Sequence, residues 1–463
     1  MAGNAGRLAL TLLVLGGAPL YAEDAKQTHQ TIIDRWGDYV PPLKLRSLLA
    51  RLEPALWRAT RCGDELAVAL PRPTLSILDS GDPIGFALGR DHVYLSRGLI
   101  AELASEAELA FVVASAFAHA CLGHRLGGTG FAPSPKNLAR LFTHPSTFFA
   151  VDAGRLEQGF NPAEERAAVR RAIRTLHRAR FNSDVVPALI AHLSKRQTST
   201  LESPGLIPLA GAGFASDGPE SLGHALAEAA KDAPLENLGQ IGRDRFLHAI
   251  DGMVLGTQAS DGVVRAHRFF HGPLGLYFEF PAGWHIQNEP HRVVGTAPSG
   301  DSLVQLNVWP APRDTPPDEA LATFFGIEIP AQSDQKETWL TENDQAYNRI
   351  IATMQTPFGE QVTAFWMTQR VSRLGPMQVA VGYASRVAPD DRIALAVAKS
   401  ARHLTPDEHA LTGPLRLRLL RAESGETFAG IAQRIGVSVT ALRRLNRAPF
   451  DEPQPGLLLK TMR

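Results

Sequence analysis

The chain has 463 residues, a length that predicts about two to four domains rather than a single core. Lys plus Arg and Asp plus Glu number 47 each, and 44% of the residues are apolar, as in a globular protein. This balance lacks the basic excess that neutralises phosphates, so we expect no nucleic-acid partner.

The first 22 residues have the pattern of a secretory signal. Arg7 precedes the apolar run Leu8–Leu15, and the small residue Ala22 ends the segment. We therefore expect cleavage after Ala22 and export to the periplasm or another exported location. An uncleaved anchor is the alternative, but the run is shorter than the roughly 20 residues of a spanning helix. No later run is long enough either, so we expect the mature protein to be soluble.

Cys62 and Cys121 are the two cysteines of the chain. An even number is compatible with one bridge in an oxidising compartment. Their spacing does not decide whether they meet, and two buried, unpaired thiols are the favoured interpretation.

Residues from about Asp24 to His192 have a mostly helical pattern interrupted by one extended element. The runs 75–78 and 93–95 are short and β-type, and the turn-rich segment 79–83 follows the first of them. They predict two strands beside a helix bundle.

A capping box is indicated by Ser105 and Glu108, just before the stretch 109–122. That stretch is apolar on all sides, which predicts a buried helix at the centre of a domain.

The segment 201–218 is rich in Gly, Pro and Ala and predicts a linker, followed by a helix over 221–230. Alternating apolar and polar residues then begin near Val263 and indicate an α+β domain. The expected strands are 276–280, 303–308, 346–354, 361–369 and 377–383, and the expected helices are 317–325 and 391–401.

The last residues predict a small βααβ unit with strands over 415–420 and 457–461 around helices over 427–435 and 439–445. We expect residues 407–463 to fold as a separable unit, because Pro406 and the turn at 412–414 set it apart. Its expected core is Leu419, Ile431, Ile435, Leu442, Leu445 and Leu458.

Four segments in the first half of the chain carry a family resemblance. They are Ile77–Ser80, Gly85–Leu88, Val93–Leu99 and Glu106–Ala110. Their order and spacing resemble the metallopeptidase family that includes HtpX, BepA and LoiP. The resemblance implies a mainly helical, gluzincin-like domain with a small β-element over residues 23–250. In that family the helix carries HExxH, with a further His five residues on.

The zinc chemistry of that family needs two His on one helix face and a Glu that activates water. The matching positions here are Ser115, Ala116 and His119, and His124 matches the trailing His. The first ligand and the general base are therefore absent, and no zinc cofactor is expected. We expect His124 to point roughly 140° away from His119 along the helix.

A later ExxAD pattern supplies the third ligand in that family. Here Glu165 and Ala168 match it, while Val169 replaces the Asp. Glu165 is expected either at the old ligand position or, as the favoured interpretation, as a solvated charge. His119 is either a vestigial ligand with Glu165 or, again favoured, a core histidine hydrogen-bonded to Ser115.

Two further resemblances concern the rest of the chain. The stretch 275–284 is similar to the opening of PsbP or Mog-like domains, which implies an α+β binding domain over 251–405. The order Gly425–Thr427, Gly436–Val439, Leu445-Asn446 and Pro455-Gly456 resembles LysM. LysM is a βααβ module that binds N-acetylglucosamine-containing glycans, and we assign it to 406–463.

Together these patterns predict an exported α+β protein of the HtpX/BepA-like family that is catalytically inactive. Its expected partners are envelope proteins or peptides, with peptidoglycan bound through the C-terminal domain. The alternative is an active zinc metalloendopeptidase of periplasmic protein quality control with a rearranged site. A third hypothesis is a protein that binds the cell wall through its C-terminal module, with the rest of the chain having no function of its own.

Overall fold

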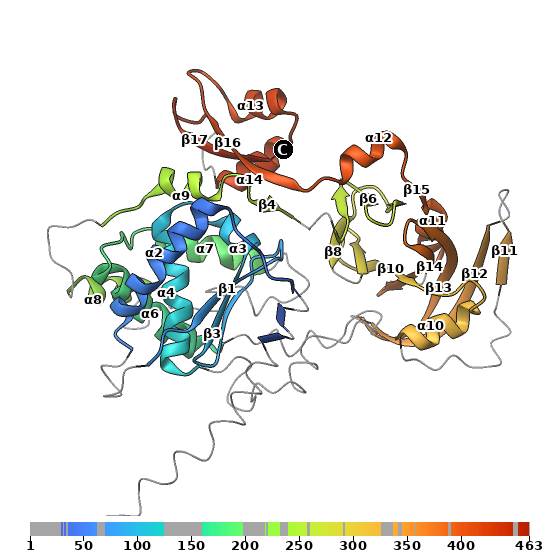
Figure 1. Cartoon of the computed structure of the whole chain (residues 1–463), viewed down its shortest axis with the longest axis horizontal. Coiled ribbons are helices and arrows are strands. Elements are labelled where there is room, and N and C mark those ends of the chain that lie inside the picture. Colours follow the sequence, from blue (N-terminus) through green and yellow to red (C-terminus); the bar gives the residue numbers. More distant parts are fainter. Residues whose placement is uncertain are drawn as a thin grey trace, which may run out of the picture.

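The structure is a computed structural model, shown in Figure 1. It describes residues 29–462 except 31, 34–35, 63–69, 125–159, 198–217, 219–220, 232–238, 257–259, 290–291, 326–336, 341–344, 357, 388–389 and 448–451. The expected signal segment and nearly all of the expected linker lie outside these residues. The described chain is mixed α+β with several sheets, and none of its helices is both long and apolar enough to span a bilayer.

Helix α4 (Glu106–Leu122) is the centre of the helical unit, the name used here for the described residues within 29–250. Nearly every residue of α4 is buried, as its all-round apolar pattern predicted. The other helices described in this unit are α2 (Leu43–Thr60), α3 (Arg97–Glu102), α6 (Pro162–Arg178), α7 (Val186–Gln197), α8 (Leu222–Lys231) and α9 (Arg243–Ile250).

Half of the expected capping box is present at the start of α4. The Ser105 hydroxyl accepts a hydrogen bond from the Glu108 N–H at 3.2 Å. The Glu108 carboxylate does not return to Ser105 and instead accepts from the Ala104 N–H at 2.8 Å. Its remaining acceptor capacity is used by Arg447, a residue from the far end of the chain.

A small sheet packs against α4. Its strands are β1 (Thr74–Leu78), β2 (Gly85–Leu88) and β3 (His92–Ser96), in the order β1-β3-β2. The two predicted strands are confirmed as β1 and β3, which pair in parallel. The strand β2 was not predicted. It lies between β1 and β3 in the sequence but at the edge of the sheet, where it pairs antiparallel with β3.

The sheet unit, the described residues within 251–405, contains a seven-stranded and a four-stranded sheet with orders β11-β12-β13-β14-β10-β9-β8 and β15-β7-β6-β5. The strands are β5 (Val263–Arg265), β6 (Arg268–His271), β7 (Leu276–Glu279), β8 (His285–Glu289), β9 (Arg292–Thr296), β10 (Ser302–Pro310), β11 (Glu337–Leu340), β12 (Ala346–Thr356), β13 (Gly359–Ser372), β14 (Gly375–Ser385) and β15 (Arg402–His403).

The two predicted helices of the sheet unit are confirmed as α10 (Pro317–Phe325) and α11 (Arg392–Ser400). Leu321 of α10 belongs to the apolar cluster that includes Ala380 of β14, whereas Val397 of α11 belongs to the cluster that includes Val379. Neighbouring residues of a strand point to opposite faces, so the two helices cover opposite faces of the large sheet.

The C-terminal unit, residues 406–462 as described, has the predicted βααβ order. After α12 (Pro406–His409) and the 3-10 helix η3 (Ala410–Thr412) come β16 (Leu415–Arg421), α13 (Phe428–Ile435), α14 (Val439–Asn446) and β17 (Leu458–Met462). Its sheet has the order β17-β16-β4, because the short strand β4 (Val254–Leu255) pairs with β16. A connector between the first two units is thus part of this sheet.

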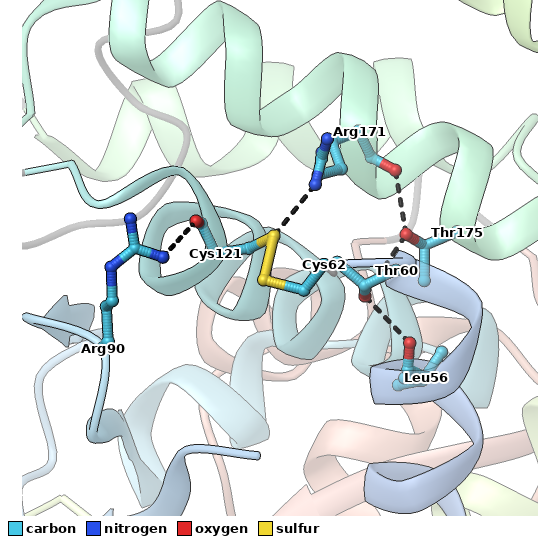
Figure 2. The surroundings of a disulfide bond; sticks show 7 residues. All are labelled: Leu56, Thr60, Cys62, Arg90, Cys121, Arg171 and Thr175. Carbon is cyan, nitrogen blue, oxygen red and sulfur yellow. Dashed lines mark hydrogen bonds between the residues drawn. A yellow bond between two sulfur atoms is a disulfide. The ribbon is translucent and has the colours of Figure 1, made fainter. Parts of the chain in front are cut away.

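Cys62 and Cys121 form a disulfide, so the interpretation as unpaired thiols is wrong. The bond joins the end of α2 to the last turn of α4, as Figure 2 shows. The Arg171 guanidinium donates to the sulfur of Cys121 at 2.9 Å, and Arg90 donates to its carbonyl at 2.9 Å. The bridge therefore fixes the C-terminal end of the central helix.

Because the bridged cysteines are 59 residues apart, the bond should stabilise the folded chain by about 4 kcal/mol through loop entropy. We predict that the double substitution Cys62→Ser and Cys121→Ser lowers the free energy of unfolding by that order, measured in urea. A reductant should have the same effect on the natural chain and none on the double variant. Equal stability of the two proteins without reductant would contradict the prediction.

Candidate functional site

His119 lies in the last turn of α4 and is 4% exposed. Its ring stacks on Phe160 with centroids 3.7 Å apart. Its Nε2 lies 3.5 Å from Oε2 of Glu165, and its Nδ1 lies 3.1 Å from Nδ1 of His124. Both ring nitrogens therefore face Glu165 and His124, and the prediction of a hydrogen bond from His119 to Ser115 is wrong.

Glu165 lies in the first turn of α6 and is 6% exposed, so the interpretation as a solvated charge is wrong. Asn161 caps this helix, its side chain accepting from the N–H groups of Ala163 and Glu164. The packing of α6 on α4 then brings the Glu165 carboxylate to His119. Its Oε2 accepts no hydrogen bond from any residue that the structure describes.

His124 is close to His119, contrary to the expectation that it would point away. Helix α4 ends at Leu122, and Gly123 adopts a left-handed conformation with φ +68° that turns the chain back. The His124 N–H then donates to the His119 carbonyl at 3.1 Å. Burial lowers the pKa of His124 to about 4, and His119 and Arg171 add to this effect, so His124 is neutral near pH 7.

These side chains do not fit a zinc site with three protein ligands. Ser115 and Ala116 are buried in α4 and supply neither an imidazole nor a carboxylate. The two neighbours of His119 meet different nitrogens of its ring, so one ion cannot bind His119, His124 and Glu165 together in this arrangement. Within the described ranges no group of three His, Cys, Asp or Glu side chains is arranged to hold a metal.

The βααβ unit is held together by helix caps and by hydrogen bonds between α14 and β17. The Thr427 hydroxyl caps α13 by accepting from the Gly430 N–H at 3.0 Å, and Gly436 ends this helix in a left-handed conformation. The Asn446 side chain donates to the Lys460 carbonyl and accepts from the Lys460 N–H, both at 2.7 Å. Asn446 thus fastens the end of α14 to β17.

Lys460 projects from β17 into the helical unit and is 2% exposed. Its Nζ donates to the carbonyls of Ala101 at 2.7 Å and Leu103 at 3.0 Å, at the C-terminal end of α3. The end of a helix presents unsatisfied carbonyls and a partial negative charge, which suit a buried amine. Burial and, secondarily, Arg447 lower the pKa of Lys460 to about 7, while Glu102 and Glu108 oppose this shift.

Arg447 makes the second polar contact of this interface. Its guanidinium binds the Glu108 carboxylate through two hydrogen bonds, of 2.6 and 3.1 Å, and also donates to the Glu102 carbonyl. Glu108 is 6% exposed in this pair, so the contact is largely removed from water. From the helical unit, Arg243 donates to the Leu458 carbonyl at 2.6 Å.

Apolar side chains complete the interface. Leu417 and Leu458 belong to the core cluster of the helical unit, and Leu419 packs against it. The helices of the C-terminal unit are instead covered by a separate cluster that includes Ile431, Leu442 and Leu459. Leu419 and Leu458 were expected in the second cluster. The C-terminal unit therefore shares apolar contacts with the helical unit, and its folding as a separable unit stays a prediction.

Sequence reasoning missed Lys460 and Arg447. A usable signal was present for the first, because Lys460 follows three consecutive leucines and stands two residues from Leu458 in a strand. Residues two apart in a strand share a face of the sheet. A Lys on the same face as a buried Leu therefore indicates either the solvent-exposed edge of that face or a buried hydrogen-bond partner for the amine. Arg447 gave no such signal.

Comparison with known proteins identifies the C-terminal unit. The family model described as LysM domain matches residues 421–460, which confirms the resemblance for this part of the chain. No curated protein matches the chain. A crystal structure from Bacteroides thetaiotaomicron is similar over 41% of this chain and 65% of that chain, with 9% identity. Its TM-score of 0.23 is too low to support any conclusion.

The contribution of Lys460 to stability should depend on pH. Its pKa is about 7 in the folded chain against 10.5 ordinarily, so between these values the unfolded chain binds the extra proton. Stability should then rise with pH across this window, on the order of 1 kcal/mol per unit. We predict that the difference in unfolding free energy between the natural chain and Lys460→Met grows from pH 7 to about pH 9.5.

Urea denaturation at several pH values measures this difference. The matched control is Lys399→Met, because Lys399 is exposed on α11 and its substitution should leave the pH profile unchanged. A difference that is constant, or that shrinks as the pH rises, would show that Lys460 is not held as a buried amine.

Proposed function

We propose that this protein is an exported envelope protein that binds peptidoglycan or related N-acetylglucosamine glycans through its LysM domain. The observation that carries the proposal is the family match at residues 421–460, together with the βααβ order of the same residues. The expected signal segment supports the export part of the proposal, since such glycans lie outside the cytoplasm.

The docking of the LysM domain on the helical unit adds to this proposal. Lys460, Arg447 and Leu458 are used in contacts with the helical unit and are not available to a ligand. Helix α13 lies farther from the helical unit than α14 does (Figure 1). A glycan bound on the α13 side would be held at a set orientation relative to the helical unit, because the interface leaves the LysM domain little freedom.

For the helical unit we propose an inactive member of the HtpX, BepA and LoiP metallopeptidase family. Ser115 and Ala116 replace a zinc ligand and the general base, and the loss of a base alone costs about 10²- to 10⁴-fold in rate. His119 and Glu165 remain neighbours, as vestigial ligands would. The sheet unit is proposed as a PsbP/Mog-like domain that binds envelope proteins or peptides.

The glycan proposal predicts that the full chain sediments with purified peptidoglycan. Soluble N-acetylglucosamine oligomers should displace it, because their acetamido groups offer an amide donor and acceptor that glucose hydroxyls do not reproduce. Glucose oligomers of the same length and linkage are the matched control and should displace it far less. Lack of sedimentation, or equal displacement by both sugars, would contradict the proposal.

An active zinc endopeptidase is the second candidate, favoured only by the 3.5 Å approach of His119 and Glu165. Against it, we predict well below one zinc per chain after dialysis with zinc, and no zinc-dependent hydrolysis of an unfolded protein substrate. His119→Ala should change neither result. Elemental analysis that finds one zinc per chain, lost in His119→Ala together with a hydrolytic activity, would establish the second candidate instead.

A further inference from the structure

The sheet unit contains a cavity of about 690 Å³ at one end of its large sheet. The cavity lies where β12 begins, where β13 approaches its turn into β14, and where α11 ends. Its volume is in the range of small-molecule sites, which is about 300 to 1,000 Å³. Neither the LysM domain nor the His119 cluster contributes to it.

Among the residues that the structure describes, the lining of this cavity carries basic side chains and no Asp or Glu. Three arginines, one lysine and one histidine line it. The basic residues are Arg313, Arg370, Lys399, Arg402 and His403. A cavity lined by one sign of charge concentrates ions of the opposite sign.

Arg370 is the fixed cation of the group. Its guanidinium donates to the Ala401 carbonyl at 3.0 Å, to the Thr368 hydroxyl at 3.1 Å and to the Tyr347 hydroxyl at 2.8 Å, and it also reaches the Gln369 carbonyl. All these acceptors are neutral. The guanidinium is therefore held in place, and none of the described residues that accept from it carries a negative charge.

Tyr347 adds a donor to the same wall. It is 3% exposed and lines the cavity, and its hydroxyl oxygen accepts from Arg370. A phenol can donate a hydrogen bond through its O–H while its oxygen accepts another. The O–H of Tyr347 can therefore orient an anion that binds beside the Arg370 guanidinium.

Lys399 and Arg313 add two further cations to the lining of this cavity. Both are exposed, and in the part of the chain that the structure describes neither side chain pairs with a carboxylate. The Arg313 backbone is anchored, because its carbonyl accepts from the Gln369 side chain at 2.9 Å. Arg402 differs from both, since Glu408 binds it through two hydrogen bonds of 2.6 and 2.7 Å and neutralises it.

We infer that this cavity binds an oxyanion group, a carboxylate or a phosphate, carried by a small molecule. Arg370 and Tyr347 form the fixed part of the site, and Lys399 and Arg313 contact the bound group. The remaining volume accommodates the body of the ligand.

Equilibrium dialysis of the full chain tests this inference with two probes, inorganic phosphate and citrate, which distinguish a phosphate site from a carboxylate site. We expect saturable binding of one probe per chain for at least one of them. The double variant Lys399→Gln with Arg313→Gln should weaken it about tenfold or more, because each cation makes a charge-assisted contact.

Arg392→Gln is the matched control. Arg392 lies on the same helix as Lys399 and is absent from the cavity lining, and its substitution removes one positive charge, which Asp390 pairs in the natural chain. It should leave the binding constant within about twofold, since remote surface charges are screened by salt. Near-UV circular dichroism verifies that all variants remain folded. Absence of saturable binding of both probes, or equal weakening in Arg392→Gln and in the double variant, would overturn the inference.

Discussion

The buried amine of Lys460 is the contact on which the docking of the C-terminal unit against the helical unit depends. Removing a charged ammonium from water costs several kcal/mol even after relaxation, so such a residue is retained only where acceptors are already in place. The C-terminal end of α3 supplies two carbonyls, and Glu102 and Glu108 add favourable charge. The lowered pKa, about 7, is the result of this balance.

Helix α4 links this contact to the His119 cluster. Glu108, near its N-terminal end, binds Arg447, while His119 and Cys121 lie near its C-terminal end. Eleven residues of helix place Glu108 and His119 roughly 16 Å apart along the axis. The disulfide and the two contacts of Cys121 with arginines hold the second end. One rigid, buried helix thus supports both the LysM interface and the degenerate site.

The sequence predicted most elements because local rules determine them. The strands β10, β13 and β14, the two helices of the C-terminal unit and the all-round apolar α4 all appear where expected. The errors came from long-range or ambiguous signals. Cysteine spacing does not encode pairing, and the left-handed Gly123 breaks the helical rotation assumed for His124. Leu457, Leu458 and Leu459 show no alternation, so their two faces could not be assigned from the sequence.

The central claim is that the LysM domain and the helical unit fold and remain stable as one body. The most direct measurement is calorimetry of the chain ending at Thr405 beside the full chain. Removing the C-terminal unit takes Leu417 and Leu458 out of the core of the helical unit, a loss of about 3 kcal/mol or more at about 1.5 to 3 kcal/mol for each buried leucine. The midpoint temperature of the thermal unfolding of the helical unit should then fall by at least about 6 °C. An unchanged transition in the shortened chain, with a separate small transition present only in the full chain, would contradict the claim.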